Sequence, residues 1–197
     1  MHSTLSGHLD RTLPASSFAN SRTGRIVFAI AATGLMAVAS HVAVPLPFSP
    51  VPLTLAPFMA VLIGLTLGPL TAFSALVLYL AEGASGLPVF TPQGPGGIAQ
   101  LLSPTGGYLF AYPLAAAVAG WLARSLPAAS STLRGLVAST AGTAVILSMG
   151  ALWLSSVLHL HAAATWSLAV APFLPGEAVK VVAAAMLYSA MCRWQQS

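Results

Sequence analysis

A succession of apolar segments, separated by short stretches rich in proline and glycine, fills the chain from residue 26 onward. Charged residues make up only 5% of the sequence, whereas a soluble domain carries about a quarter. In lipid, backbone N–H and C=O groups must find partners within the chain, so apolar segments of this kind cross a membrane as helices. The sequence therefore predicts an all-α integral membrane protein.

With about 20 residues needed for each span, the chain has room for six transmembrane helices. The predicted spans cover residues 26–44, 53–67, 70–82, 108–122, 136–157 and 175–192. The second and third are short, which suggests local bilayer thinning or helices partly buried in protein. A polar tail, residues 1–25, precedes the membrane domain, residues 26–197. The first apolar run also fits a signal peptide, but the equally apolar remainder favours a retained first span.

All arginine residues lie in the termini and loops that a chain of six spans places on one side of the membrane. The loops 45–52, 83–107 and 158–174 contain no lysine or arginine. The N-terminal tail, the connection after the fourth span and the C-terminus contain Arg11, Arg22, Arg25, Arg124, Arg134 and Arg193. Because positive loops stay on the cytoplasmic side, both termini of this multi-pass protein are predicted to be cytoplasmic.

The only lysine of the chain, Lys180, follows Glu177 by three residues inside the last apolar segment. Residues at this spacing share one helix face, and ionisable side chains at membrane depth usually face a partner or a cavity. Pro175 suits the first helical turn, where Glu177 gains from the helix dipole. The pair predicts a site for a small ligand with N–H and C=O groups; a buried pair that pins two helices together is the alternative.

Residues 83–107 combine glycine and proline with apolar side chains. Irregular backbone of this kind is tolerated in a membrane only where protein covers it or it lines a cavity. Gln100, Thr105 and Tyr108 are its polar candidates for ligand contact, and its glycines allow close approach of backbone to a ligand. A re-entrant loop that packs on itself is the alternative. A phosphate-binding loop is not indicated, since the required spacing and lysine are absent.

Other polar residues give weaker signals. His159 and His161 form an H-x-H pair, for which solvated loop histidines are favoured over a metal site. Glu82 ends the third span, where water contact and a site role are equally compatible with its position. Ala29, Thr33 and Ala37 form a stripe of small residues on the first span, which predicts either partner docking or internal packing. No catalytic set can be assembled, so the sequence predicts no enzyme, and no arginine patch indicates nucleic-acid binding.

Four segments carry a resemblance to a known family: 50–54 (PVPLT), 79–90 (YLAEGASGLPVF), 103–108 (SPTGGY) and 172–180 (PFLPGEAVK). They resemble the BioY family, the biotin-specific S component of energy-coupling-factor (ECF) vitamin transporters. The resemblance covers most of residues 26–193 and implies an S-component fold that holds biotin near the outer face. It also implies import energised by cytoplasmic ATPases through a transmembrane coupling protein. Some members are proposed to work alone or as homo-oligomers.

The resemblance and the residue chemistry together predict ten substrate-binding residues and no cofactor. These are Leu87, Phe90, Gly97, Gln100, Thr105, Gly106, Gly107, Tyr108, Glu177 and Lys180. The family commonly has aspartate at the position of Glu177, and the outer loops contain no basic residue that would meet the biotin carboxylate. An S component for another vitamin, a structural membrane subunit and an intramembrane enzyme that uses Lys180 are the alternatives.

Overall fold

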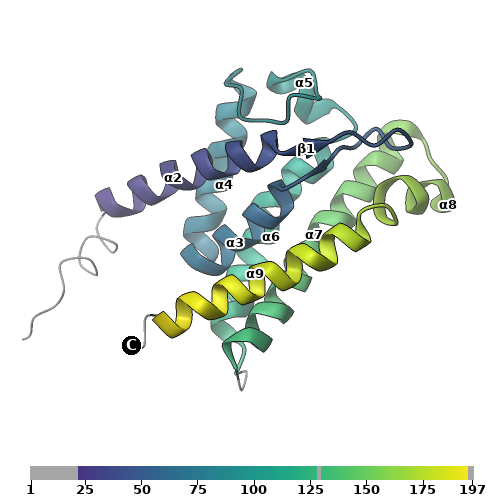
Figure 1. Ribbon diagram of the computed structural model, residues 1–197. Coiled ribbons are helices and arrows are strands. Elements are labelled where there is room, and N and C mark those ends of the chain that lie inside the picture. Colours follow the sequence, from purple (N-terminus) through teal and green to yellow (C-terminus); the bar gives the residue numbers. More distant parts are fainter. Residues whose placement is uncertain (1–21, 128–129, 195–197) are drawn as a thin grey trace, which may run out of the picture.

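A computed structural model describes residues 22–127 and 130–194, and these residues are mostly helical (Figure 1). The long helices are α2 (Arg22–His41), α3 (Ala56–Leu67), α4 (Pro69–Ala84), α6 (Gly106–Ser125), α7 (Ser131–Leu158) and α9 (Leu174–Trp194). The short elements are β1 (Ala43–Val44), β2 (Leu53–Thr54), α5 (Gly97–Leu102), α8 (Ala162–Thr165) and the π-helical turn η1 (Trp166–Val170). Each predicted span has a long helix at its centre.

Two of these helices, α6 and α7, are long and apolar enough to cross a bilayer by themselves. The segment from α8 through η1 and α9 meets the same criteria as one span, with a bend of 49° at its break. Residues 26–41 of α2, together with α3 and α4, are apolar but shorter. The number of membrane crossings, like the cytoplasmic position of both termini, stays a prediction.

The structure corrects the start of the second predicted span. Leu53 and Thr54 do not begin a helix but form strand β2, which pairs antiparallel with β1. Helix α3 begins only at Ala56, with Pro57 in its first turn. The predicted loops 83–107 and 158–174 likewise contain the short helices α5, α8 and η1.

Helices α3 and α4 are separated by a single residue, Gly68, with a φ of 81°. Pro69 then starts α4, where its missing N–H costs no hydrogen bond. Arg124, near the end of α6, donates from Nη2 to the carbonyl oxygen of Leu67 at 3.1 Å and so covers this turn. A side chain at residue 68 would collide with that guanidinium group. The turn therefore depends on glycine for both its conformation and its space.

Helix α6 lies at the centre of the molecule and packs against α3, α4 and α7. One row of its buried surface consists of small residues, Ala111, Ala115, Ala116, Ala119, Gly120 and Ala123. Small side chains allow the backbones of membrane helices to approach closely. At the crossing of α3 with α6, a Cβ atom on Gly64 would lie 2.3 Å from the carbonyl oxygen of Ala116.

The two ends of the bundle differ in structure. The β1–β2 hairpin, α5 and α8 lie at one end, whereas the end of α6, the start of α7 and the end of α9 lie toward the other (Figure 1). The loop of the hairpin reaches η1, where Ser49 Oγ donates to the carbonyl oxygen of Leu168 at 2.8 Å. The three loops that were predicted to share one side of the membrane, 45–52, 83–107 and 158–174, thus lie at the same end of the bundle (Figure 1).

The two loop histidines have structural positions beside α8. His159 ends α7 with a left-handed backbone conformation, and His161 Nδ1 accepts a hydrogen bond from the N–H of Ala164 at the start of α8. Within residues 22–127 and 130–194, no group of three or more His, Cys, Asp or Glu side chains is placed to hold a metal ion.

We predict that Gly64→Ala lowers the apparent melting temperature of the purified protein by at least about 3 °C, because overpacking typically costs 1–3 kcal/mol. Gly34→Ala on α2 is the matched control, since nothing lies within 4 Å of a Cβ atom there. Thermal unfolding in detergent measures both. Equal melting temperatures for the two variants would contradict the close α3–α6 contact.

Candidate ligand-binding site

A cavity opens among the elements at the hairpin end of the bundle. Its empty space, including the open mouth, amounts to about 560 Å³. Segments from α2 to α9 contribute to it. The lining residues are Ser40, Val51, Pro52, Thr54, Ala56, Pro57, Thr91, Gln100, Thr105, Tyr108, Leu109, Tyr112, Ile146, Leu147, Phe173 and Glu177.

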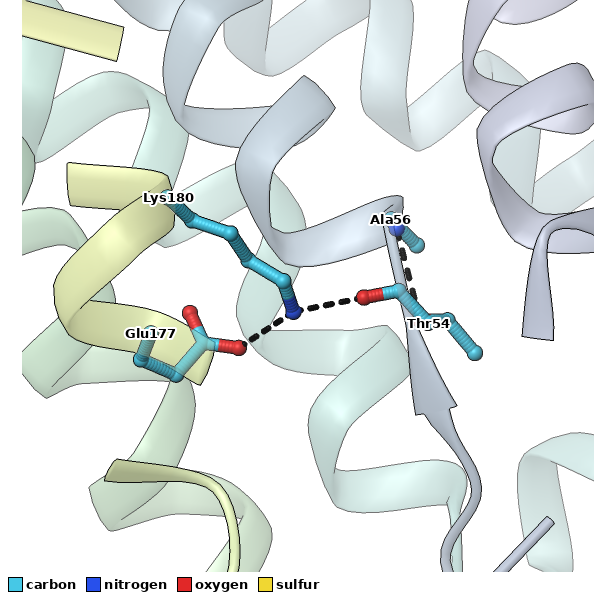
Figure 2. Close-up of polar contacts among 4 residues, drawn as sticks. All are labelled: Thr54, Ala56, Glu177 and Lys180. Carbon is cyan, nitrogen blue, oxygen red and sulfur yellow. Dashed lines mark hydrogen bonds and ion pairs between the residues drawn. The ribbon is translucent and has the colours of Figure 1, made fainter. Parts of the chain in front are cut away.

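The ion pair predicted from the sequence is present and buried beside this cavity. Lys180 Nζ lies 2.7 Å from Glu177 Oε1 and donates also to the carbonyl oxygen of Thr54 at 2.6 Å (Figure 2). Glu177 is only 4% exposed and Lys180 only 9%. Thr54 Oγ1 in turn accepts from the N–H of Ala56, the first residue of α3. Lys180 therefore connects α9 to the end of the hairpin. A contact of this kind is what the alternative interpretation, a buried pair that joins two elements, predicts.

The second carboxylate oxygen of Glu177 has a different environment. Oε2 is buried and has no hydrogen-bond partner among the residues that the structure describes, and in Figure 2 only the other oxygen is joined to Lys180. A buried acceptor without a donor is costly, more so when it is charged. Glu177 lines the cavity whereas Lys180 does not. Glu177 therefore lies at the cavity with one oxygen unused by the described residues, while Lys180 holds the other oxygen.

Aromatic and aliphatic side chains form most of the cavity wall. The Tyr108 hydroxyl donates to the carbonyl oxygen of Ala169 at 2.8 Å, and its ring lies 6.2 Å from that of Phe173. Tyr112 lies one helical turn beyond Tyr108 on the same face of α6. The sequence analysis singled out Tyr108 but missed Tyr112 and Phe173. Tyr112 follows Tyr108 by four residues, and Phe173 precedes Glu177 by four. This spacing is the sequence signal that could have identified both residues.

Gln100 and Thr105 line the cavity, and both are engaged with their own segment. Gln100 is fully buried; its Oε1 accepts from the N–H of Gly96, and its Nε2 donates to the carbonyl oxygen of Thr91. The hydroxyl groups of Thr105 and Ser103 are hydrogen bonded to each other at 2.8 Å. These contacts give the glycine-rich segment a fixed shape beside the cavity.

Five of the other predicted substrate contacts do not line this cavity. Leu87 is 53% exposed. Phe90 packs edge-on against Tyr79, with ring centroids 5.4 Å apart, and Gly97 supplies a φ of 58° at the start of α5. Gly106 and Gly107 allow α6 to approach Leu101 and Trp153. The glycines are therefore required for turns and close packing, because the residues that they contact belong to the protein itself.

The stripe on α2 faces mainly inward. Thr33 is buried, and its Oγ1 donates to the carbonyl oxygen of Ile30 and lies 3.3 Å from the partly exposed Glu82 carboxylate. Ala29 and Ala37 are half-buried. These contacts favour internal packing against α4, and only the edges of the two alanines remain for a docking partner. Glu82 does not line the cavity.

A buried carboxylate and an aromatic wall, enclosed by apolar helices, are typical of a membrane-embedded protein that binds a small ligand with both polar and apolar parts. Comparison with known families agrees with this class. The BioY family model matches residues 11–197, so the chain belongs to the BioY family, as the resemblance of its motifs implied.

Individual relatives support this assignment, and one solved structure shares the fold. The "Probable biotin transporter BioY" of Pyrococcus horikoshii is 39% identical over 138 residues, 70% of this chain and 78% of the relative. The "Biotin transporter BioY" of Thermotoga maritima is 36% identical over 155 residues, 79% of this chain and 88% of the relative. The crystal structure of "the S-component for biotin from an ECF-type ABC transporter" has the same fold, with a TM-score of 0.77 and 22% identity. It covers 86% of this chain and 90% of that chain.

We predict that Lys180→Met destabilises the ligand-free protein by about 3–5 kcal/mol, because it leaves the Glu177 carboxylate buried without its cation. The double variant Glu177→Gln/Lys180→Met should recover most of that loss, because neither charge remains. The apparent melting temperatures of the two variants and the parent test this. A double variant no more stable than Lys180→Met would show that charge pairing is not what holds these elements together.

Proposed function

We propose that this protein binds biotin in the cavity and imports it as the membrane-embedded S component of an ECF-type transporter. Membership of the BioY family, whose curated relatives are named biotin transporters, supports the ligand and the transport role. The same relatives indicate a transport protein and not an enzyme. The observation that carries the proposal is the buried, unpartnered Oε2 atom of Glu177 at the cavity.

The chemistry of biotin matches the polar and apolar parts of this site. Its ureido ring presents two N–H donors, and Glu177 Oε2 is an acceptor with free lone pairs. Lys180 holds the other oxygen and so fixes the carboxylate in place. The apolar thioether ring and tail would lie against the wall that Tyr108, Tyr112 and Phe173 form. Burial of this surface favours binding by about 25 cal/mol per Å².

The proposal includes a topology. The predicted spans at 26–44, 53–67, 70–82, 108–122, 136–157 and 175–192 cross the bacterial inner membrane with both termini in the cytoplasm. The cavity then opens toward the outer face, where an importer collects its substrate. The apolar character of the helices and the placement of arginine outside the proposed outer loops support this orientation. Residues 1–25 are a cytoplasmic tail, and residues 26–197 form the binding domain.

Transport against a gradient requires an energy source, which we assign to partner proteins. The sequence contains no nucleotide-binding motif, and the S component with the same fold comes from an ECF-type ABC transporter. A transmembrane coupling protein and cytoplasmic ATPases are the proposed partners. The small residues Ala29, Thr33 and Ala37 on α2 are the proposed docking stripe, of which Ala29 and Ala37 are partly accessible.

We predict that Glu177→Gln lowers biotin affinity about 10–150-fold, the equivalent of one hydrogen bond to a charged acceptor. Glu82→Gln is the matched control, because Glu82 carries the same charge at the same end of the molecule but does not line the cavity. Labelled biotin binding to purified protein measures both variants.

Dethiobiotin and riboflavin serve as competitors in the same assay. Dethiobiotin, which keeps the ureido group, should displace biotin, whereas riboflavin should not. Displacement by riboflavin alone would favour another vitamin as the substrate. Unchanged affinity in Glu177→Gln would contradict the role of this carboxylate, and unchanged uptake after both charges are removed would favour a purely structural role for the pair.

The topology is tested with two matched serine replacements in a Cys192→Ser background. Ser85 directly follows α4, and Ser125 is the last residue of α6. Both are exposed, and they lie at opposite ends of the bundle. A membrane-impermeant maleimide should label Ser85→Cys in intact cells and Ser125→Cys only after the cells are opened. The reverse pattern would place the cavity on the cytoplasmic side.

A further inference from the structure

A second hollow adjoins the cavity at its open side. The two share Pro52, Thr91 and Thr105 in their linings, so they lie side by side. The outer hollow, here called the vestibule, contains about 380 Å³ of empty space including solvent-open space. Its remaining lining comes from the hairpin loop and from residues 93–104. A ligand bound in the cavity would therefore extend its outer end into the vestibule.

All nine residues that line the vestibule are uncharged: prolines, one glycine, and side chains with hydroxyl or amide groups. The sequence also places no lysine or arginine in residues 45–52 and 83–107, from which the vestibule is built. Lys180 is committed to Glu177 and to the backbone of Thr54. A carboxylate at the outer end of a ligand therefore meets no cation within this lining.

The start of α6 does not supply a free anion site in place of a cation. The N–H of Thr105 donates to Ser103 Oγ, that of Gly106 to the carbonyl oxygen of Ser103, and that of Tyr108 to the carbonyl oxygen of Thr105. These bonds engage the amides of Thr105, Gly106 and Tyr108 within the protein. The vestibule therefore offers neutral hydrogen-bonding groups and no concentrated positive charge.

Gln100 lies where the cavity and the vestibule meet. It lines the cavity, and its side-chain amide packs directly on Gly94, which lines the vestibule. One hydrogen of Nε2 is donated to the carbonyl oxygen of Thr91, and an amide nitrogen carries two. The other can be donated to a carbonyl oxygen of the ligand. A carboxylate and a carboxamide both present such an oxygen, so a neutral donor distinguishes them poorly.

The orientation of the ligand follows from the charges. Glu177 is a carboxylate inside the cavity, so it repels an anionic tail and favours the N–H groups of the ureido ring. We propose that the protein does not distinguish the charge of the tail and accepts biotin derivatives whose tail carboxylate is neutralised or extended as an amide. This inference rests on the proposed function. Biotin amides of lysine, which proteolysis of biotinylated proteins would release, are the substrate class that fits the vestibule.

Competition binding with three probes tests the proposal: biotin, its primary carboxamide and biotinyl-lysine. The expected dissociation constants of the two amides lie within about threefold of that of biotin, with weak dependence on ionic strength. A loss of tenfold or more for both amides would overturn the proposal, because it would require a group that reads the carboxylate charge. Failure of biotin itself to bind would instead contradict the proposed function.

A gain-of-charge variant provides an independent test. Gln93→Arg places a cation in the vestibule, and Ser125→Arg places the same cation near the end of α6, away from both hollows. Gln93→Arg should raise the affinity for biotin at least threefold over that for the carboxamide, and added salt should remove this difference. Ser125→Arg should leave the ratio near one. An unchanged ratio in Gln93→Arg would show that the tail does not lie in the vestibule and would overturn the proposal.

Discussion

The buried ion pair of Glu177 and Lys180 holds together the elements that form the cavity. One ammonium group contacts the carboxylate on α9 and the backbone carbonyl of Thr54, immediately before α3. Within apolar surroundings such contacts are strong, and loss of one partner leaves a charge that the interior cannot solvate. The pair therefore fixes α9 relative to the hairpin. It also leaves one carboxylate oxygen, Oε2, without a protein partner at the cavity.

Helix packing decides where the cavity can form. At the α3–α6 crossing, Gly64 and Gly120 bring the backbones into close contact, so no space remains between them. At the hairpin end, prolines prevent the chain from continuing as helix, and the segments 45–52 and 91–105 lie across the ends of the helices instead. A bundle that is tight at one crossing and covered by irregular backbone at one end provides both rigidity and a binding site.

Much of the fold was accessible from the sequence because apolar length and proline positions constrain where membrane helices lie. The centres of the long helices follow the predicted spans, and Glu177 lies in the first turn of α9 as Pro175 indicated. The start of α3 was misplaced, because Leu53 and Thr54 directly follow the last proline of the loop and lead without a break into the apolar helix. Their strand pairing with Val44 and Ala43 depends on a partner ten residues away, which local pattern does not reveal.

By itself the sequence determined that the chain is an apolar helical protein and that Glu177 and Lys180 belong together, because two charges in hydrocarbon have few other options. Only the tertiary structure decided how the pair is used. Lys180 turns to Thr54, 126 residues earlier, and Tyr112 and Phe173 join the wall while Leu87 and Phe90 do not. These outcomes depend on how distant segments pack, since a side chain's neighbours across a bundle are set by helix crossings and not by sequence spacing.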